Sequence, residues 1–446
     1  MKKITLNLFV AVAISIFFFS SAQVIADNIK YTDAWGNQGY NLVQSKQTGV
    51  NVIHSINEFS LELMEINGEQ MHVLNMPGVF LPNNEGAPNL PGNGNRIAIP
   101  EGSVPVLNIV STRTEVYQNI NLAPAPNIPW DDDNSPLVYA RNMEIYGQDA
   151  YYPAQPVQIS EIQQIRGVDF VMLGITPFQY NPITKELIVY RDIDVEINFL
   201  GSTGTFGEER LRSRWWDPIL EDALLNHESL PEVDYNWMYQ QSTRSGEECE
   251  YIIISPDGAE FQQWADSIRD WRTKQGILTN VVTLTEIGGN STAAIEAYIN
   301  NAYNNWAVPP AACLLLGDFG YSVTNNVISP IYNNYCASDN IYADVSGNSM
   351  PDVVFARITA NDASQLETMV TKFIHYERTP PTNLHYYGHP ITALGWQTER
   401  WFQICSESVG GFWTNELGKS VERINAIYSG SPGSTWSTAQ NTATVV

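Results

Sequence analysis

The chain has 446 residues, of which 43% are hydrophobic and only 16% are charged. This length exceeds one ordinary hydrophobic core, so the composition predicts a globular protein of two or three domains. Its 48 acidic residues against 23 basic ones give a net charge of −25, which excludes binding to nucleic acid through the phosphates.

The first residues have the pattern of a signal peptide. Two lysines precede an apolar run from Leu6 to Phe19, and small residues follow. The run is short for a membrane span, which needs about 20 residues, although an uncleaved anchor is the alternative. We predict a signal peptide over 1–26 and an exported protein that is periplasmic, at the cell surface or extracellular. No membrane span is expected after the signal is removed.

Four cysteines are spread along the chain, at Cys249, Cys313, Cys336 and Cys405. Their spacing contains no C-x-x-C pair and no zinc-site pattern with histidine. Cys249 and Cys313 fall in apolar, strand-like runs, where a cysteine is usually a small buried hydrophobic residue. Cys405 falls in a helical stretch and is also expected to be buried.

The first half of the chain is predicted to be all-β. Residues 27–200 carry short alternating runs broken by Pro, Gly and Asn, and the last two runs flank "QYNPITK" as in a hairpin. We therefore predict a sandwich-like β-domain over 27–200. The clearest runs are 49–56, 60–66, 71–76, 95–100, 104–117, 168–178 and 186–200.

A connecting segment follows at 201–247. "GSTGTFG" is rich in glycine, and the amphipathic residues 210–230 are expected to dock on a neighbouring domain. Arg244 lies in a polar stretch where a trypsin-like activity could cut. We predict a linker with Arg244 as the candidate processing site.

The pattern then changes to apolar runs that alternate with amphipathic stretches. "EYIIIS" (250–255) is typical of a strand buried on both faces, and Phe261, Trp264 and Ile268 follow on one face of a helix. This alternation predicts an α/β domain over 248–446 with a parallel sheet and helices on both faces. Further strands are expected at 278–284, 311–318, 352–357, 391–395 and 421–428, with helices at 290–306, 361–378 and near 400–418.

Two of these helices begin with capping residues, either Asn290 or Ser291 in one case and Asn361 or Asp362 in the other. In open α/β sheets, ligands bind at the C-terminal ends of the strands. The loops "SPDG", "GDFGYS" and "GWQTERW" are therefore the expected places for a functional site.

The second half resembles the gingipain-type cysteine peptidases, which have a caspase-like α/β core. The resemblance lies in "EYIIIS" with the helix and strand after it, in "CLLLGD", in "SDNIYADVSGNSMPDVVFARI" and in "FIHYER". The first half is similar to the propeptide-like β-domain of such proteins through "PGVFLPNNEGAPNLPGNGNRIAIPEGS". The resemblance implies an exported cysteine endopeptidase precursor that acts on protein or peptide substrates and requires no cofactor.

The sequence departs from this family in one respect. The family uses a histidine in a Gly-His-Gly loop and a cysteine after the next strand, and neither motif occurs here. We therefore expect no catalytic residue within this chain and an α/β domain that is incomplete at its C-terminus. A pair formed by His389 and Cys405 is the alternative. By resemblance to arginine-specific relatives, Glu399 is the candidate specificity residue; otherwise it is a first-turn helix glutamate.

The loop before the strand at 352–357 is rich in oxygen ligands, which suggests structural calcium. Asp339, Asp344, Asn348 and Asp352 supply carboxylate and amide oxygens, and Gly347 permits a tight turn. The alternative is a hydrogen-bonded turn without metal. Because the loop precedes a core strand, we place it at the N-terminal end of that strand, away from the expected chemistry.

Two other functions stay open. One is a non-catalytic secreted surface or binding protein with a degenerate peptidase-like domain. The other is a metal-dependent hydrolase that uses the acidic loop, although no histidine lies near that loop in the sequence.

Overall fold

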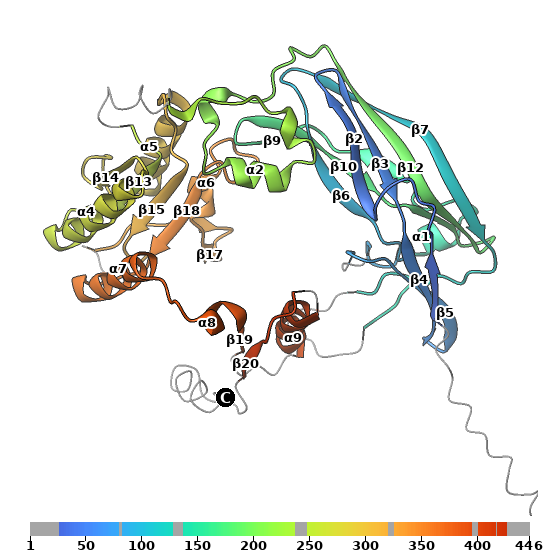
Figure 1. Cartoon of the computed structure of the whole chain (residues 1–446). Helices are drawn as coiled ribbons and strands as arrows, with labels where there is room; N and C mark the ends of the chain where they lie inside the picture. The colour runs from blue at the N-terminus through green and yellow to red at the C-terminus, as the bar shows by residue number, and fades with distance from the viewer. Residues whose placement is uncertain are drawn as a thin grey trace, which may run out of the picture.

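The computed structural model describes residues 26–79, 83–127, 137–236, 248–319, 325–394, 400–415 and 417–425. Figure 1 shows two bodies, a β-rich part in the blue and green half of the chain and an α/β part in the yellow to red half. Within those ranges, no helix is long and apolar enough to cross a membrane.

Antiparallel sheets form the β-rich part. One has the order β1-β4-β5, one the order β6-β10-β8 with β9 also on β10, and one the order β11-β12-β3-β2 with β7 also on β12. The bounds are β1 Ala26–Lys30, β2 Gly39–Lys46, β3 Gly49–Ser55, β4 Glu58–Ile66, β5 Glu69–Asn75, β6 Asn93–Ala98, β7 Val104–Tyr117, α1 Met143–Tyr146, β8 Val157–Ile159, β9 Gln163–Ile165, β10 Val168–Ile175, β11 Phe178–Asn181 and β12 Glu186–Leu200.

The main core of this part lies between two of the sheets. Alternate side chains of β12, among them Ile193 and Ile197, are fully buried and share one cluster with Phe170 and Leu173 of β10. Burial of every second residue is what a strand with one face in a core requires. The predicted strands at 104–117 and 186–200 and the hairpin between β11 and β12 are confirmed.

The segment after β12 packs against both parts. It contains the short helices η1 Glu209–Leu211, α2 Asp217–Ala223 and η2 His227–Ser229. Trp216 and Leu220 are buried in the main core of the β-rich part, whereas Leu211 is buried in a core of the α/β part. The expected docking of this amphipathic segment therefore involves both bodies at once.

A four-stranded parallel sheet with the order β14-β13-β15-β18 lies at the centre of the α/β part. Ile252 and Ile254 of β13 pack with α5 in one core, and Ile253 packs with α4 and α7 in another, so helices cover both faces as predicted. The bounds are β13 Tyr251–Ser255, α4 Ala259–Lys274, β14 Thr279–Thr283, α5 Thr292–Asn305, β15 Ala312–Leu316, β16 Ile331–Tyr332, β17 Cys336–Ala337, α6 Asn340–Ala343, β18 Val354–Ile358 and α7 Ala363–Arg378.

The last elements form a separate unit. They are α8 Leu384–Gly388, β19 Ile391–Leu394, α9 Arg400–Asn415 and β20 Glu422–Asn425. Strand β19 pairs in parallel with β20 in a two-stranded sheet of their own. The predicted strand, helix and strand are present, but they do not extend the four-stranded sheet as the simple alternation suggested.

Candidate functional site

The C-terminal edge of the four-stranded sheet is the expected place for chemistry, and its described loops carry oxygen groups. Ser255 is the last residue of β13, and its side chain is fully buried. In the loop that follows, the Asp257 side chain accepts a hydrogen bond from the Thr285 amide at 3.1 Å. After β15, the Asp318 amide donates to the Ala360 carbonyl at 3.1 Å. The described residues of these loops contain no cysteine or histidine, so they supply neither a thiolate nor an imidazole.

Asp339 belongs to this edge and is held there by an arginine. The Arg357 guanidinium donates from Nε and Nη2 to the two Asp339 carboxylate oxygens, at 2.8 and 2.7 Å. Its Nη1 donates to the carbonyls of Gly317 and Val327, at 2.9 and 2.6 Å. Such a bidentate pair fixes the carboxylate firmly. The expectation that the whole acidic loop lies at the N-terminal end of the strand is therefore wrong for Asp339.

Asp352 lies at the opposite edge, just before β18. Its side chain is almost fully buried and accepts from the Ser346 amide at 2.7 Å and from the Arg166 amide at 3.3 Å. The Tyr303 hydroxyl lies 3.4 Å from the same oxygen that faces Arg166. The three residue steps from Val354 to Arg357 span about 10 Å of extended chain, so Asp352 before the strand and Asp339 beside Arg357 lie too far apart to share one small ion.

The two remaining candidate ligands close a turn between these ends. Asp344 accepts hydrogen bonds from the amides of Asn348 and Ser349, at 3.0 and 2.8 Å. The Asn348 side chain accepts from the Met350 amide and donates to the Gln164 carbonyl of the β-rich part. Within the described ranges, no three His, Cys, Asp or Glu side chains are placed to hold a metal together. Calcium binding stays a prediction, and this geometry favours its alternative, the hydrogen-bonded turn.

The cysteines fall into two classes. Cys249 and Cys313 are buried, as predicted, and burial raises the pKa of the Cys249 thiol to about 12 and that of Cys313 well above its usual range. Both are therefore protonated at neutral pH and unreactive as nucleophiles. Cys336 in β17 and Cys405 in α9 are exposed. The expected burial of Cys405 is wrong.

The remaining sequence candidates do not form a site in the described structure. His389 stacks on His385 at 3.5 Å, with its Nδ1 2.9 Å from the His385 carbonyl oxygen. No hydrogen bond joins His389 to Cys405 within the described ranges. Glu399 and Arg244 lie outside the described residues.

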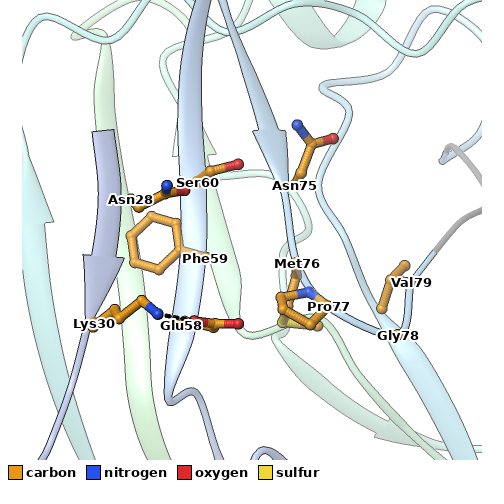
Figure 2. Close-up of a pocket in the computed structure, with 10 residues that line it drawn as sticks. All are labelled: Asn28, Lys30, Glu58, Phe59, Ser60, Asn75, Met76, Pro77, Gly78 and Val79. Atoms are coloured by element: carbon orange, nitrogen blue, oxygen red, sulfur yellow. Dashed lines mark ion pairs between the residues drawn. The ribbon is translucent and has the colours of Figure 1, made fainter. Parts of the chain in front are cut away.

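The β-rich part contains a polar cavity of about 500 Å³ next to β4 and β5 (Figure 2). Lys30 and Glu58 form an ion pair of 2.9 Å at this cavity, and Phe59, Asn28 and Asn75 also line it. The lining has amide and hydroxyl groups and the Lys30–Glu58 ion pair but no thiol or imidazole, so it suits the binding of a polar ligand and lacks a cysteine–histidine pair.

Comparison with known proteins assigns families to both parts of the chain. The family described as Propeptide_C25 matches residues 32–229, and Peptidase family C25 matches residues 244–400. The chain is of the gingipain type. Its C25 propeptide region covers β2 to β12 and the short helices of the docking segment, and its C25 peptidase region covers the four-stranded sheet.

Individual relatives agree with this assignment. Lys-gingipain HG66 of Porphyromonas gingivalis is 25% identical over 353 residues, which are 76% of this chain and 20% of the relative. Gingipain R2 of the same species, strain W83, is 23% identical over 69% of this chain and 40% of the relative. The chain thus spans about a fifth to two fifths of the length of these relatives. A solved complex of the RgpB pro- and mature domains from that species aligns with a TM-score of 0.39 and 20% identity, over 43% of this chain and 98% of the other.

Proposed function

We propose that this chain belongs to the precursor of an exported cysteine endopeptidase, in which a β-rich propeptide precedes an α/β peptidase domain. The observation that carries the proposal is the order of the two C25 matches along the chain. They fall on two bodies, each of which has a core formed by its own residues alone, as a propeptide and an enzyme domain require. In such an enzyme a thiolate attacks the peptide carbonyl and an imidazole transfers the proton.

None of the four cysteines of this chain is proposed as the nucleophile. The thiols of Cys249 and Cys313 are buried and their pKa values are raised, which opposes thiolate formation. Cys336 and Cys405 are exposed, and no hydrogen bond joins either one to an imidazole in the described part of the chain. An activated thiol needs such a base or another source of positive charge.

The enzyme is proposed to select its substrates by a basic side chain. One similar protein carries lysine in its name, Lys-gingipain. Glu399 is the candidate acid that would receive this side chain, because a carboxylate pairs with lysine or arginine in a partly dry pocket. Export through the segment 1–26 and processing after Arg244 complete the proposal.

The test uses native protein captured from its producing culture with antibodies raised against residues 248–446. Peptides with lysine, arginine or alanine before the scissile bond are assayed with and without iodoacetamide, which alkylates thiolates. We expect thiol-sensitive cleavage after a basic residue, and an N-terminus at residue 27 or 245 by Edman sequencing. The recombinant segment 27–446 is the matched control and is expected to be inactive.

The captured protein is separated from its β-rich part before the assay. If it then shows no cleavage that iodoacetamide inhibits, the proposed peptidase activity is contradicted. That outcome favours the second candidate, a non-catalytic secreted binding protein. The polar cavity of about 500 Å³ beside β4 and β5 supports this candidate, since ligand sites are concave and carry a few placed polar groups.

A further inference from the structure

Arg166 occupies an unusual position at the tip of the β9–β10 hairpin. Its backbone φ is +48°, a left-handed conformation that a residue other than glycine or asparagine seldom adopts. Gly167 follows with a φ of +74°, and a Cβ there would lie 2.4 Å from the Leu211 side chain. The turn therefore brings the hairpin tip into close contact with the docking segment, at a backbone cost that points to a role for the arginine side chain.

The Arg166 side chain is fully buried, and each of its three guanidinium nitrogens lies within 3.5 Å of a carbonyl oxygen. Nε donates to the Leu211 carbonyl at 2.7 Å, and Nη1 donates to the carbonyls of Pro310 and Asp352 at 2.8 and 2.6 Å. The carbonyl of Pro309 lies 3.5 Å from Nη2. A converging set of carbonyl oxygens matches the planar fork of arginine and would not match the point charge of lysine.

Aromatic rings and one carboxylate complete this surrounding. The guanidinium carbon lies 5.4 Å from the ring centre of Trp216 and 5.1 Å from that of Tyr303, which is within range of cation–π attraction. The buried Asp352 carboxylate balances the charge, and it faces the Arg166 backbone amide. We call this set of groups around Arg166 the guanidinium socket: Leu211, Trp216, Tyr303, Pro309, Pro310 and Asp352.

The guanidinium socket is shared between the two C25 regions. Leu211 and Trp216 belong to the propeptide match, as does Arg166 itself, whereas Tyr303, Pro309, Pro310 and Asp352 belong to the peptidase match. It lies at the N-terminal edge of the parallel sheet, where Ala312 of β15 pairs with Val354 of β18. The Trp216 indole donates to the Ala311 carbonyl at the same edge, at 2.9 Å. The C-terminal edge, with Asp318 and Asp339, is left free of this contact.

We propose that Arg166 is the anchor by which the β-rich part recognises the α/β part, through a socket selective for a guanidinium group. A buried charge that has lost its counter-charge is costly, so removal of the Arg166 side chain leaves the Asp352 carboxylate without a nearby positive charge and the carbonyls of Leu211, Pro310 and Asp352 without their donor. Arg166 is therefore expected to contribute a large share of the binding energy of the two parts, beside contacts such as those of Arg210 with the carbonyls of Tyr303 and Trp306. This inference does not depend on the proposed peptidase activity.

The test starts from the full chain with a recognition sequence for an added endopeptidase inserted after Arg244. After cleavage, the wild-type halves are expected to migrate together in size-exclusion chromatography. In Arg166→Ala their dissociation constant is expected to rise about a hundredfold or more. Arg166→Lys keeps the charge and the length of the stem, and it is expected to weaken association at least about tenfold.

Chemical rescue separates a guanidinium socket from a general loss of folding. Guanidinium ions at low millimolar concentration are expected to restore association of the cut Arg166→Ala protein, whereas urea, which has the same planar shape without charge, is not. Arg141→Ala is the matched control, because Arg141 stacks on Tyr146 and pairs with Glu69 inside the β-rich part. Its halves should remain associated as in the wild type.

Three results would overturn the proposal: separation of the cut wild-type halves, wild-type affinity of Arg166→Lys, or equal rescue by urea. If Arg166→Ala fails to fold, Arg166→Lys decides the question by its affinity alone.

Discussion

At the scale of single residues, His54 makes the β-rich part sensitive to acid. Its side chain is fully buried in β3, and its ring centre lies 5.1 Å from that of Tyr40 with the two rings nearly perpendicular. Neither ring nitrogen has a hydrogen-bond partner in the described structure. Burial lowers the pKa of His54 from 6.5 to about 4, and the nearby Asp192 charge opposes this only in part. The folded protein therefore holds a neutral imidazole that the unfolded chain would protonate.

This gives a stability that depends on pH. Between pH 6.5 and about 4 the unfolded state binds a proton that the folded state does not, so the free energy of unfolding falls as the pH falls. The free energy of unfolding has fallen by about 3 kcal/mol when the pH reaches the pKa of His54 in the folded protein. Below that pH, His54 causes little further loss. In His54→Leu the free energy of unfolding should not show this decrease with falling pH. Urea unfolding at several pH values between about 4 and 7 would measure the difference from the wild type.

The exposed His375 supplies the control for His54. His375→Leu removes an exposed histidine of α7 in the α/β part, and its unfolding, measured in the same way, is the comparison for His54→Leu. An unchanged acid slope in His54→Leu would show that other groups cause the acid sensitivity.

The sequence could identify the burial of Cys249 and Cys313, although it was wrong for Cys405, and it could not identify the residue that joins the two bodies. Cys249 and Cys313 lie in apolar runs, so their burial follows from local pattern. Arg166 stands alone in "QQIRGVDF", and its partner Asp352 is 186 residues away in the chain. The one local signal is Arg-Gly between two short apolar runs, which indicates a tight turn but not what the arginine contacts.

At the scale of elements, helix α7 depends on one cap. Asp362 accepts a hydrogen bond from the Gln365 amide at 2.9 Å, and the Gln365 side chain accepts from the Asn361 amide at 3.0 Å. This reciprocal arrangement satisfies amides that the first helical turn would otherwise leave without partners. The cap also sets the start of the helix that buries Leu366 and Val370 against the sheet.

Asp362→Ala should lower the free energy of unfolding of the α/β part by about 1 kcal/mol, since the cap is lost and the buried face is unchanged. Chemical unfolding followed by far-ultraviolet circular dichroism would measure it. Asp362→Asn, which keeps the acceptor oxygen, is the control and should stay within a few tenths of a kcal/mol of the wild type. Equal losses in both variants would assign the effect to charge rather than to the cap.

Strands and helices could be predicted from the sequence where burial gives their apolar residues a recognisable pattern. The two central strands of the parallel sheet, β13 and β15, are buried on both faces and give continuous apolar runs, so both were predicted. Strand β2 was missed because it has no fully buried residue and thus no alternation to detect. For the two helix caps the sequence offered two candidates each, and hydrogen bonds to the first turn select Ser291 and Asp362.

At the scale of the whole molecule, the loop 338–353 connects three regions. Its start is held at the C-terminal edge of the sheet by Arg357, and its end is held at the N-terminal edge beside Arg166. Between them, Asn348 donates to the Gln164 carbonyl of the β-rich part at 2.6 Å. The sequence showed the oxygen groups of this loop but not their separation, because only the parallel pairing of β15 and β18 places its two ends at opposite edges.

Arginines balance two of the three carboxylates of this loop, Asp339 and Asp352, and backbone amides satisfy Asp344, which makes calcium dispensable for folding. We therefore expect the melting temperature of the full chain to be the same after dialysis against EDTA and in millimolar calcium. An ion that binds the folded state at a hundred times its dissociation constant would stabilise it by about 2.7 kcal/mol, which a melting curve detects easily. Asp339→Asn should instead lower the melting temperature with or without calcium, because Arg357 loses its bidentate carboxylate partner. A calcium-dependent rise in the wild type that Asp339→Asn abolishes would show that the carboxylate binds the ion in preference to Arg357.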